Sequence, residues 1–152
     1  MLPPHVYEEA RLTATEHVQV EVVGVGKPAA TADSPPGDHG LCRVHGRVAQ
    51  VFRGRLRVGE RVTFDVSCAT RGSRVPMGGT LWTDMHALSE AHVVEGFFNR
   101  EGERLAVAGD QIEIVPMVRR VPYCGAKGVW FIPALPSVSL LAAWWNRLIH
   151  HR

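Results

Sequence analysis

The segment from Cys42 to Cys68 constrains the fold more than any other part of this 152-residue chain. Apolar residues alternate with polar ones in its first and last thirds, and a glycine- and arginine-rich stretch separates the two. Successive side chains of a strand point to opposite faces, so this alternation predicts two strands that each bury one face. The stretch over 53–60 predicts the turn between them. The buried faces would carry Val44, Val48 and Phe52 in the first strand, and Val62, Phe64 and Val66 in the second.

Short elements of the same kind fill most of the remaining chain, in keeping with its 15 glycines and 10 prolines. A strand over 92–98 has no polar face, so we expect it to be covered on both sides. Five principal strands with a short helix after the third are the layout of the OB-fold, a small Greek-key barrel. The other predicted elements are a helix over 3–14, a strand over 17–22, a short helix over 83–90 capped by Thr83 or Asp84, and a last strand over 111–115.

These elements predict three parts of the chain. An N-terminal helix would occupy residues 1–15, and an all-β, OB-like barrel would occupy residues 16–118. A proline-broken linker and a C-terminal amphipathic helix would fill residues 119–152. The barrel is long enough to bury a core of its own, so it is the part that we expect to carry the fold.

Two stretches of the barrel resemble a known family. In 46–64, GRVAQVFRGRLRVGERVTF, a strand ends in Val-Phe-x-Gly and a Leu-x-x-Gly turn follows; in 93–99, VVEGFFN, a strand carries an aromatic pair. Over about residues 16–115 the pattern is similar to the OB-type module of the netrin and tissue-inhibitor-of-metalloproteinase group. The resemblance implies the fold. It does not imply inhibition, because those inhibitors bind the protease zinc through an N-terminal cysteine, and here no cysteine precedes Cys42.

The three cysteines, Cys42, Cys68 and Cys124, form no CxxC pair and are odd in number. We therefore expect no disulfide framework. Cys42 and Cys68 coincide with the apolar faces of their strands, which favours buried core residues. The N-terminus lacks the basic-then-apolar profile of a secretory signal, so the sequence favours a cytoplasmic protein.

The arginines raise a nucleic-acid hypothesis, although the net charge is only +2. OB barrels commonly bind single strands by stacking bases on aromatic side chains within a basic groove. The polar face of the predicted hairpin shows His45 and no aromatic residue, so a solvated outer face is the favoured interpretation. In the alternative, a single-stranded nucleic acid would contact Arg43, Arg47, Arg53, Arg55 and Arg57.

Metal and enzyme hypotheses find less support. His39, Cys42 and His45 are of metal-binding types, but residues three apart in a strand face opposite ways, and no second Cys/His pair follows. We expect neither a metal site nor a cofactor. A hydrolase would need a nucleophile, a base and an orienting group, and the chain has no GxSxG pattern. Asp84, His86 and Glu90 are the remaining candidates, and a solvated helical face explains them equally well.

The favoured hypothesis is a non-enzymatic binding module for a protein or a small ligand. A glycine-rich loop over 75–82 has the backbone freedom to form either an anion-binding nest or a tight turn at the barrel mouth. It is not a P-loop, because no Gly-Lys-Ser/Thr follows. The predicted ligand-binding residues are Pro76, Met77, Gly78, Gly79 and Trp82.

The end of the chain predicts a helix from Ser137, with an apolar stripe and basic residues near its last turn. Pro133 and Pro136 precede it, and the segment is too short to span a bilayer. It would pack on its own barrel or on a second copy in a homodimer, which we favour, or lie in a membrane interface. Its interface residues would be Leu141, Trp144, Trp145 and Leu148.

Overall fold

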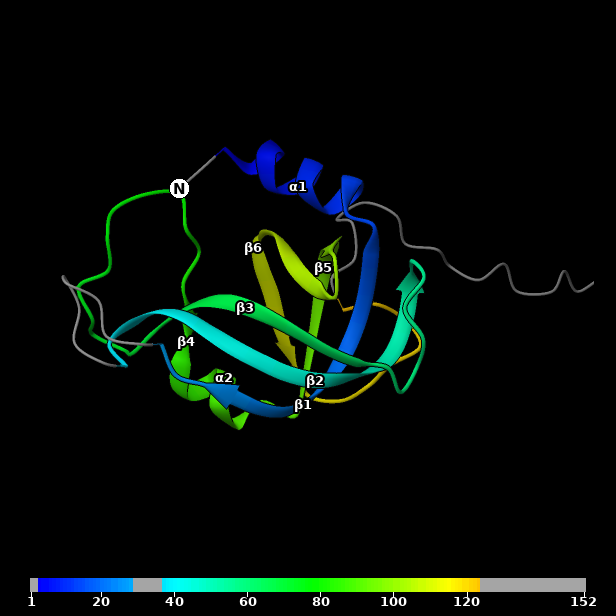
Figure 1. The fold of residues 1–152 in the computed structure, drawn as a ribbon. Helices are drawn as coiled ribbons and strands as arrows, with labels where there is room; N and C mark the ends of the chain where they lie inside the picture. The colour runs from blue at the N-terminus through cyan, green and yellow to red at the C-terminus, as the bar shows by residue number, and fades with distance from the viewer. Residues whose placement is uncertain (1–2, 29–36, 124–152) are drawn as a thin grey trace, which may run out of the picture.

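The computed structural model describes residues 3–28 and 37–123 of the chain. The strand content is high, and two short helices accompany the strands (Figure 1). The elements in chain order are α1 (Pro4–Thr13), β1 (Glu16–Gly26), β2 (His39–Arg53), β3 (Arg61–Ala69), β4 (Thr83–Asp84), α2 (Met85–Glu90), β5 (Val93–Glu101) and β6 (Arg104–Val115).

Five of the strands form a closed barrel. The strands β2, β1, β5, β6 and β3 lie side by side in this order, and β3 pairs with β2 to close the sheet. Neighbouring strands run antiparallel except β3 and β6, which are parallel where Phe64 lies opposite Leu105. With α2 between β3 and β5, this is the topology of the OB-fold and confirms the predicted fold class. The two-residue β4, which pairs with the end of β3, was not predicted.

The barrel interior is filled by apolar side chains from all five strands and from α2. Phe64 and Phe98 meet near its centre, with ring centroids 4.8 Å apart. Met85 and Leu88 of α2 add to this core from below the barrel in Figure 1. Asp84 begins α2 as its N-cap, because its side chain accepts a hydrogen bond from the backbone N–H of Ala87. Of the two predicted caps, Thr83 and Asp84, the structure therefore selects Asp84.

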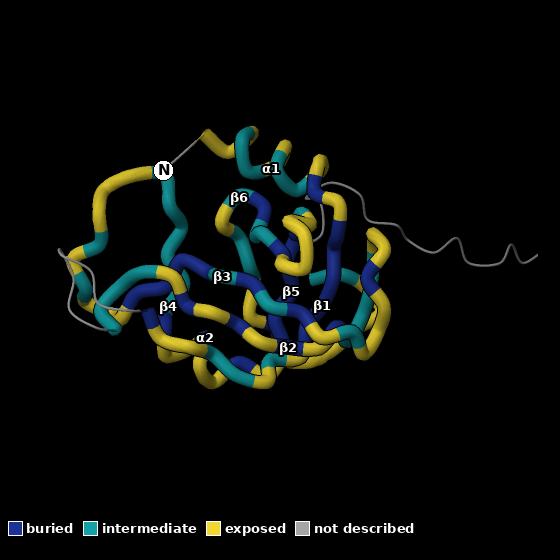
Figure 2. Tube along the Cα trace, in the orientation of Figure 1, coloured by how far each residue is buried: buried dark blue, intermediate teal, exposed yellow. Residues whose placement is uncertain are grey.

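Strand β5 is buried on both faces, as predicted, and Figure 2 shows its buried stretch inside the molecule. Its inward face contributes to the barrel core. Its outward face carries Phe97, which packs against Ala10 and Ala14 at the end of α1 and against Ala108 of β6. Helix α1 therefore covers the outer side of β5 and β6, on the opposite side of the barrel from α2 (Figure 1).

Strand β2 changes face before it ends. Its register with β1 shifts at Ala49 and again at Phe52, and neither residue has a partner in β1. Each extra residue shifts the alternation of side chains by one position. Val51 consequently packs against the barrel core, and Phe52 contacts His17 on the outer side, with ring centroids 4.9 Å apart. The prediction that Phe52 lies on the buried face of this strand is wrong.

A disulfide bond joins Cys42 of β2 to Cys68 of β3. Both residues are fully buried, which confirms their prediction as core residues. The prediction that no disulfide forms is wrong. In the antiparallel register Cys42 lies opposite Val66 and Cys68 lies opposite Gly40, so the cysteines are diagonal neighbours with Cα atoms 5.8 Å apart. This distance suits a disulfide, and neither the odd cysteine count nor the spacing reveals it.

Candidate functional site

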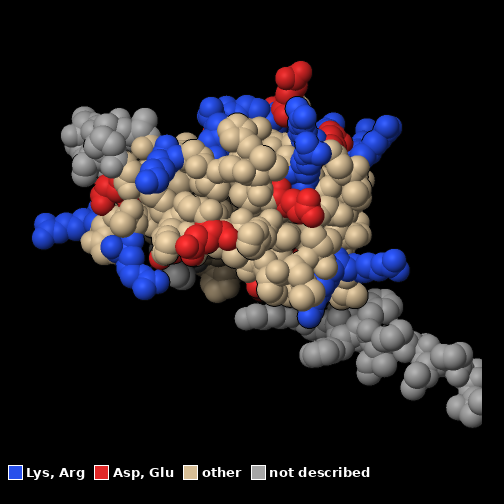
Figure 3. All heavy atoms as spheres, turned by 90° about the horizontal axis from the view of Figure 1, so that it is seen from below, with Lys and Arg blue, Asp and Glu red and all other residues tan. Residues whose placement is uncertain are grey.

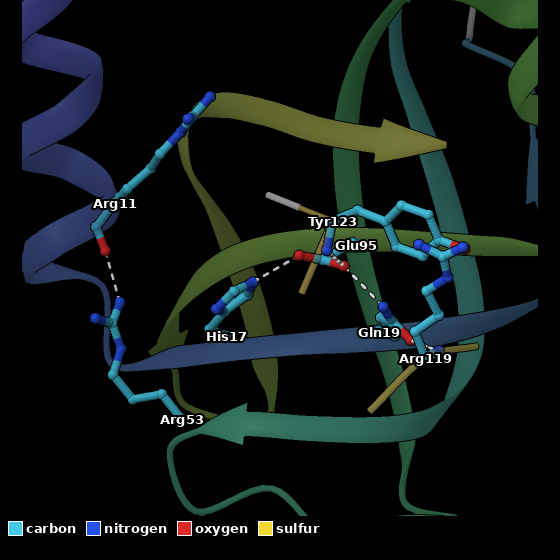
Figure 4. Close-up of polar contacts among 7 residues, drawn as sticks. All are labelled: Arg11, His17, Gln19, Arg53, Glu95, Arg119 and Tyr123. Atoms are coloured by element: carbon cyan, nitrogen blue, oxygen red, sulfur yellow. Dashed lines mark hydrogen bonds and ion pairs between the residues drawn. The ribbon is translucent and has the colours of Figure 1, made fainter. Parts of the chain in front are cut away.

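A buried polar network lies on the outer side of β1 and β5 (Figure 4). Its centre is the fully buried carboxylate of Glu95. Oε1 of Glu95 lies 2.9 Å from Nε2 of His17, and Oε2 accepts a hydrogen bond of 2.8 Å from Nε2 of Gln19. Oε2 also accepts a 2.9 Å bond from the backbone N–H of Tyr123. Sequence reasoning missed this network, because one acid in an apolar strand carries no signal of the donors around it.

The same network holds the last described residues against the barrel. Residues 117–123, which we name the strap, follow β6 and contribute two backbone donors. Besides the Tyr123 bond, the backbone N–H of Arg119 donates to Oε1 of Gln19 at 2.8 Å. The guanidinium of Arg119 lies 4.6 Å from the centroid of the Tyr123 ring. His17 and Glu95 are both buried, so this arrangement suits a structural clamp better than a proton-transfer site.

A cleft of about 370 Å³, which we name the α1 cleft, lies between α1, the loop before β4, and strands β5 and β6. Phe97 forms part of its wall and stacks on His17, with ring centroids 3.9 Å apart. The guanidinium carbons of Arg11 and Arg53 lie 5.9 and 5.7 Å from the same ring. Both distances allow a cation–π interaction, so Phe97 links the cleft wall to the buried network.

Polar groups from α1 and β6 meet in this cleft. Arg11 donates from Nη2 to Oε1 of Gln111, while its Nε is buried and has no hydrogen-bond partner within residues 3–28 and 37–123. Asp110 has a φ of 52° and is the one non-glycine residue of the described chain with a positive φ. It lies in a β6 bulge opposite Phe97, where the register with β5 is shifted. Bulges and unusual backbone angles of this kind concentrate beside binding sites.

The predicted ligand loop contributes only part of its residues to this cleft. Trp82 lines the α1 cleft, and its ring meets His39 edge-on with centroids 5.5 Å apart. The carbonyl of Gly79 accepts a 2.8 Å hydrogen bond from the Tyr7 hydroxyl, which ties the loop to α1. Trp82 therefore lines the same cleft as residues of α1, β5 and β6 that are far from it in sequence. Three predicted residues are exposed and do not line the cleft: Pro76, Met77 and Gly78.

The five arginines of the nucleic-acid hypothesis have different surroundings. Arg43 donates from Nε to Asp65 at 2.9 Å, and this hydrogen bond is the main reason why the pKa of Asp65 is lowered. Arg53 donates to the backbone carbonyl of Arg11 at 2.6 Å, near the C-terminal end of α1, where a cation is favourable (Figure 4). In the view of Figure 3 the basic side chains are spread around the face with acidic ones among them.

The other three arginines lie on the surface of β2 and in the turn that follows it. Arg47 is exposed and lies opposite Arg61 in the pairing of β2 with β3. Arg55 and Arg57 lie in the turn between these strands, beside a second cleft. Of the five, Arg43 and Arg53 therefore bond to neighbouring groups, and Arg55 and Arg57 line the second cleft.

The residues weighed for metal binding or catalysis make structural contacts. Cys42 is held in the disulfide, and no cluster of three metal-ligating side chains occurs in the described part of the chain. The carboxylate of Asp84 serves as a helix cap, and the N–H of Ala87 is the main reason why its pKa is lowered. His86 and Glu90 form an exposed pair with an N–O distance of 3.6 Å. The contacts of Asp84, His86 and Glu90 are those of a short surface helix.

The predicted interface of the C-terminal helix lies outside the described residues; it comprises Leu141, Trp144, Trp145 and Leu148. Within the described residues, neither helix has the length and apolar character that crossing a membrane requires. Comparisons of the chain with protein-family models, with curated proteins and with solved structures found no match.

Proposed function

We propose that this chain is a non-enzymatic binding module and that its ligand occupies the α1 cleft. The observation that carries the proposal is the convergence of four separate segments on one cavity beside a strained bulge. Helix α1 contributes Arg11, the loop contributes Trp82, β5 contributes Phe97 and β6 contributes Gln111. A concave site with aromatic walls and a few convergent polar groups is the usual form of a small-ligand site.

The chemistry of the walls favours a small aromatic ligand with a cationic or donor group. Trp82 and Phe97 offer apolar ring surface, and the carboxylates of Asp110 and Glu113 line the same cleft. A cationic group would therefore lie near two acids and one arginine. An acceptor atom on the ligand that draws the Arg11 side chain toward it would also satisfy the buried Nε–H, which is otherwise unfavourable.

An NMR titration of the ¹⁵N-labelled full chain with tyramine and phenylalaninamide tests this proposal, because each probe combines an aromatic ring and an ammonium group with an oxygen that can accept from Arg11. We expect the indole N–H signal of Trp82 and the Nε–H signal of Arg11 to shift with each probe. Arg11→Ala should weaken binding by about tenfold, because it removes a wall of the cleft and its hydrogen bond to Gln111. Arg74→Ala, in an exposed loop position outside the cleft, is the matched control.

The proposal fails if neither probe shifts these signals at millimolar concentration, or if Arg74→Ala weakens binding as much as Arg11→Ala does. We do not extend the proposal to single-stranded nucleic acid. Two of the five arginines in that hypothesis are already engaged: Arg43 donates to Asp65 of β3, and Arg53 donates to the backbone carbonyl of Arg11 in α1.

A further inference from the structure

A second cleft, of about 570 Å³, lies where the turn between β2 and β3 approaches the end of β5. We name it the basic cleft. The four residues that line it are all charged, three positively and one negatively: Arg55, Arg57, Glu60 and Arg100. Arg100 comes from β5, 40 positions after Glu60, so the sequence alone does not associate it with the arginines of the turn.

The backbone of this turn is held in place from beneath. The carboxylate of Glu16 is only 2 % exposed and accepts hydrogen bonds from the backbone N–H groups of Arg55, at 2.8 Å, and Leu56, at 3.2 Å. The side chain of Leu56 is buried in the barrel core. Arg55 and Arg57 flank this anchored residue, so their backbone is positioned before any ligand binds. Such preorganisation lowers the entropy that binding must overcome.

The acid in the basic cleft is already engaged. Oε1 of Glu60 accepts a 3.0 Å bond from Nη2 of Arg100, and Oε2 accepts a 2.9 Å bond from the backbone N–H of Arg57. Glu60 therefore holds Arg100 and the turn in position. The guanidinium groups of Arg55 and Arg57 have no hydrogen-bond or ion-pair partner among the described residues. The cleft consequently presents two unpaired guanidinium groups on an anchored backbone.

We propose that the basic cleft binds the phosphate groups of a small polyphosphate ligand. A guanidinium presents its donors in a planar fork that matches two oxygens of a tetrahedral oxyanion. Two unpaired forks beside Arg100 suit a ligand with more than one such group. This site shares no lining residue with the α1 cleft, so the inference goes beyond the proposed function.

Isothermal titration calorimetry of the full chain with sodium pyrophosphate at low ionic strength tests the inference. We expect one binding event per chain with a dissociation constant of about 1 mM or tighter. Arg55→Gln with Arg57→Gln should weaken binding by about tenfold or more, because both unpaired forks are lost. Arg47→Gln with Arg61→Gln is the matched control, since it removes the same charge from the neighbouring face of β2 and β3 and should change the affinity by less than about twofold.

Four results would overturn the inference. The first is an absence of binding heat for pyrophosphate, and the second is an equal loss of affinity in the control pair. The third is an affinity for sulfate equal to that for pyrophosphate, which would make the cleft a general anion site. A single-stranded oligonucleotide that binds more tightly than pyrophosphate, and loses affinity equally in both double variants, would assign the basic surface to nucleic acid instead.

Discussion

Two buried glutamates, Glu16 and Glu95, each hold a chain segment on the barrel. Glu16 accepts from two backbone N–H groups of the β2–β3 turn, and Glu95 accepts from the strap and from Gln19. A carboxylate is rarely buried unless donors surround it, and here most donors are backbone groups. Glu16 therefore adds backbone hydrogen bonds to a turn that Leu56 also anchors in the core, whereas Glu95 holds a strap whose Met117, Val118 and Val121 are exposed.

Removal of the Glu95 carboxylate should destabilise the fold. In Glu95→Ala the donors of His17, Gln19 and Tyr123 lose their acceptor in a buried site, so we expect the free energy of unfolding to fall by about 3 kcal/mol. Glu95→Gln keeps one acceptor oxygen and the side-chain volume, and should lose only about 1 kcal/mol. Urea denaturation measures both values. Equal losses in the two variants would contradict the role of the carboxylate.

Asp65 gives a pH-dependent prediction. Hydrogen bonding from Arg43 lowers its pKa in the folded state below the ordinary 3.8. The stability that Asp65 contributes is therefore complete above the unfolded-state pKa and is lost as the pH falls through the lower folded-state pKa. We expect Asp65→Asn to lose about 0.5–1 kcal/mol between pH 5 and 8, with a difference from the wild type that shrinks below about pH 4. Thermal melts across this pH range measure the difference, and a constant offset at every pH would contradict the prediction.

At the scale of elements, the β2–β3 turn depends on the close approach of its backbone to Glu16. Gly54 has a φ of +113°, and a Cβ added there would lie 1.8 Å from Oε2 of Glu16. Gly59, in the same turn, has a φ of +86° but open space around the same position. Substitutions at these two glycines therefore allow the cost of backbone strain to be measured separately from the cost of steric overlap.

Substitution of these glycines should have unequal effects. Gly59→Ala adds only the strain of a positive φ, about 1 kcal/mol, whereas Gly54→Ala must also displace the Glu16 carboxylate and should lose at least about 3 kcal/mol. Chemical denaturation of the two variants provides the comparison. If Gly54→Ala were as stable as Gly59→Ala, the bond between Glu16 and the turn would not be required for folding.

The elements themselves follow closely from local patterns. The alternation of apolar and polar residues predicts β2 and β3. Apolar residues on both sides of β5, interrupted by Glu95, predict that this strand is covered on both faces. The α2 cap follows from Asp84 and the helix after it. The face change of β2 does not follow, because a bulge depends on how β1 pairs with β2 and leaves no periodic signal at Ala49.

For the whole molecule, the disulfide is the feature with the widest consequence. It joins β2 to β3 across 26 positions inside the barrel core. The expectation of a cytoplasmic protein rested on the N-terminal profile and on cysteines expected to stay reduced. The second ground no longer holds, because disulfides persist mainly in oxidising compartments. Localisation stays a prediction, as does the resemblance to the netrin and tissue-inhibitor-of-metalloproteinase group.

Thiol counting and unfolding measurements test the disulfide. Of the three cysteines, only Cys124 should react with an alkylating reagent in denaturant without reductant, and all three should react after reduction. Cys42→Ala with Cys68→Ala should lower the free energy of unfolding by about 3.5 kcal/mol, the chain-entropy value for a loop of this length. Three reactive thiols in unreduced protein would show that the bond does not form.

The sequence by itself determined the barrel, because side-chain alternation and turn residues are local properties that need no partner strand. It also singled out Trp82, which lines the α1 cleft, and the binding role of this residue stays a prediction. The tertiary structure alone decided which distant residues meet: Cys42 with Cys68, Glu95 with the strap, and Arg100 with the arginines of the turn. The physical reason is that these contacts depend on strand register and on barrel closure. Register and closure are set by the packing of the whole core, and no single segment encodes them.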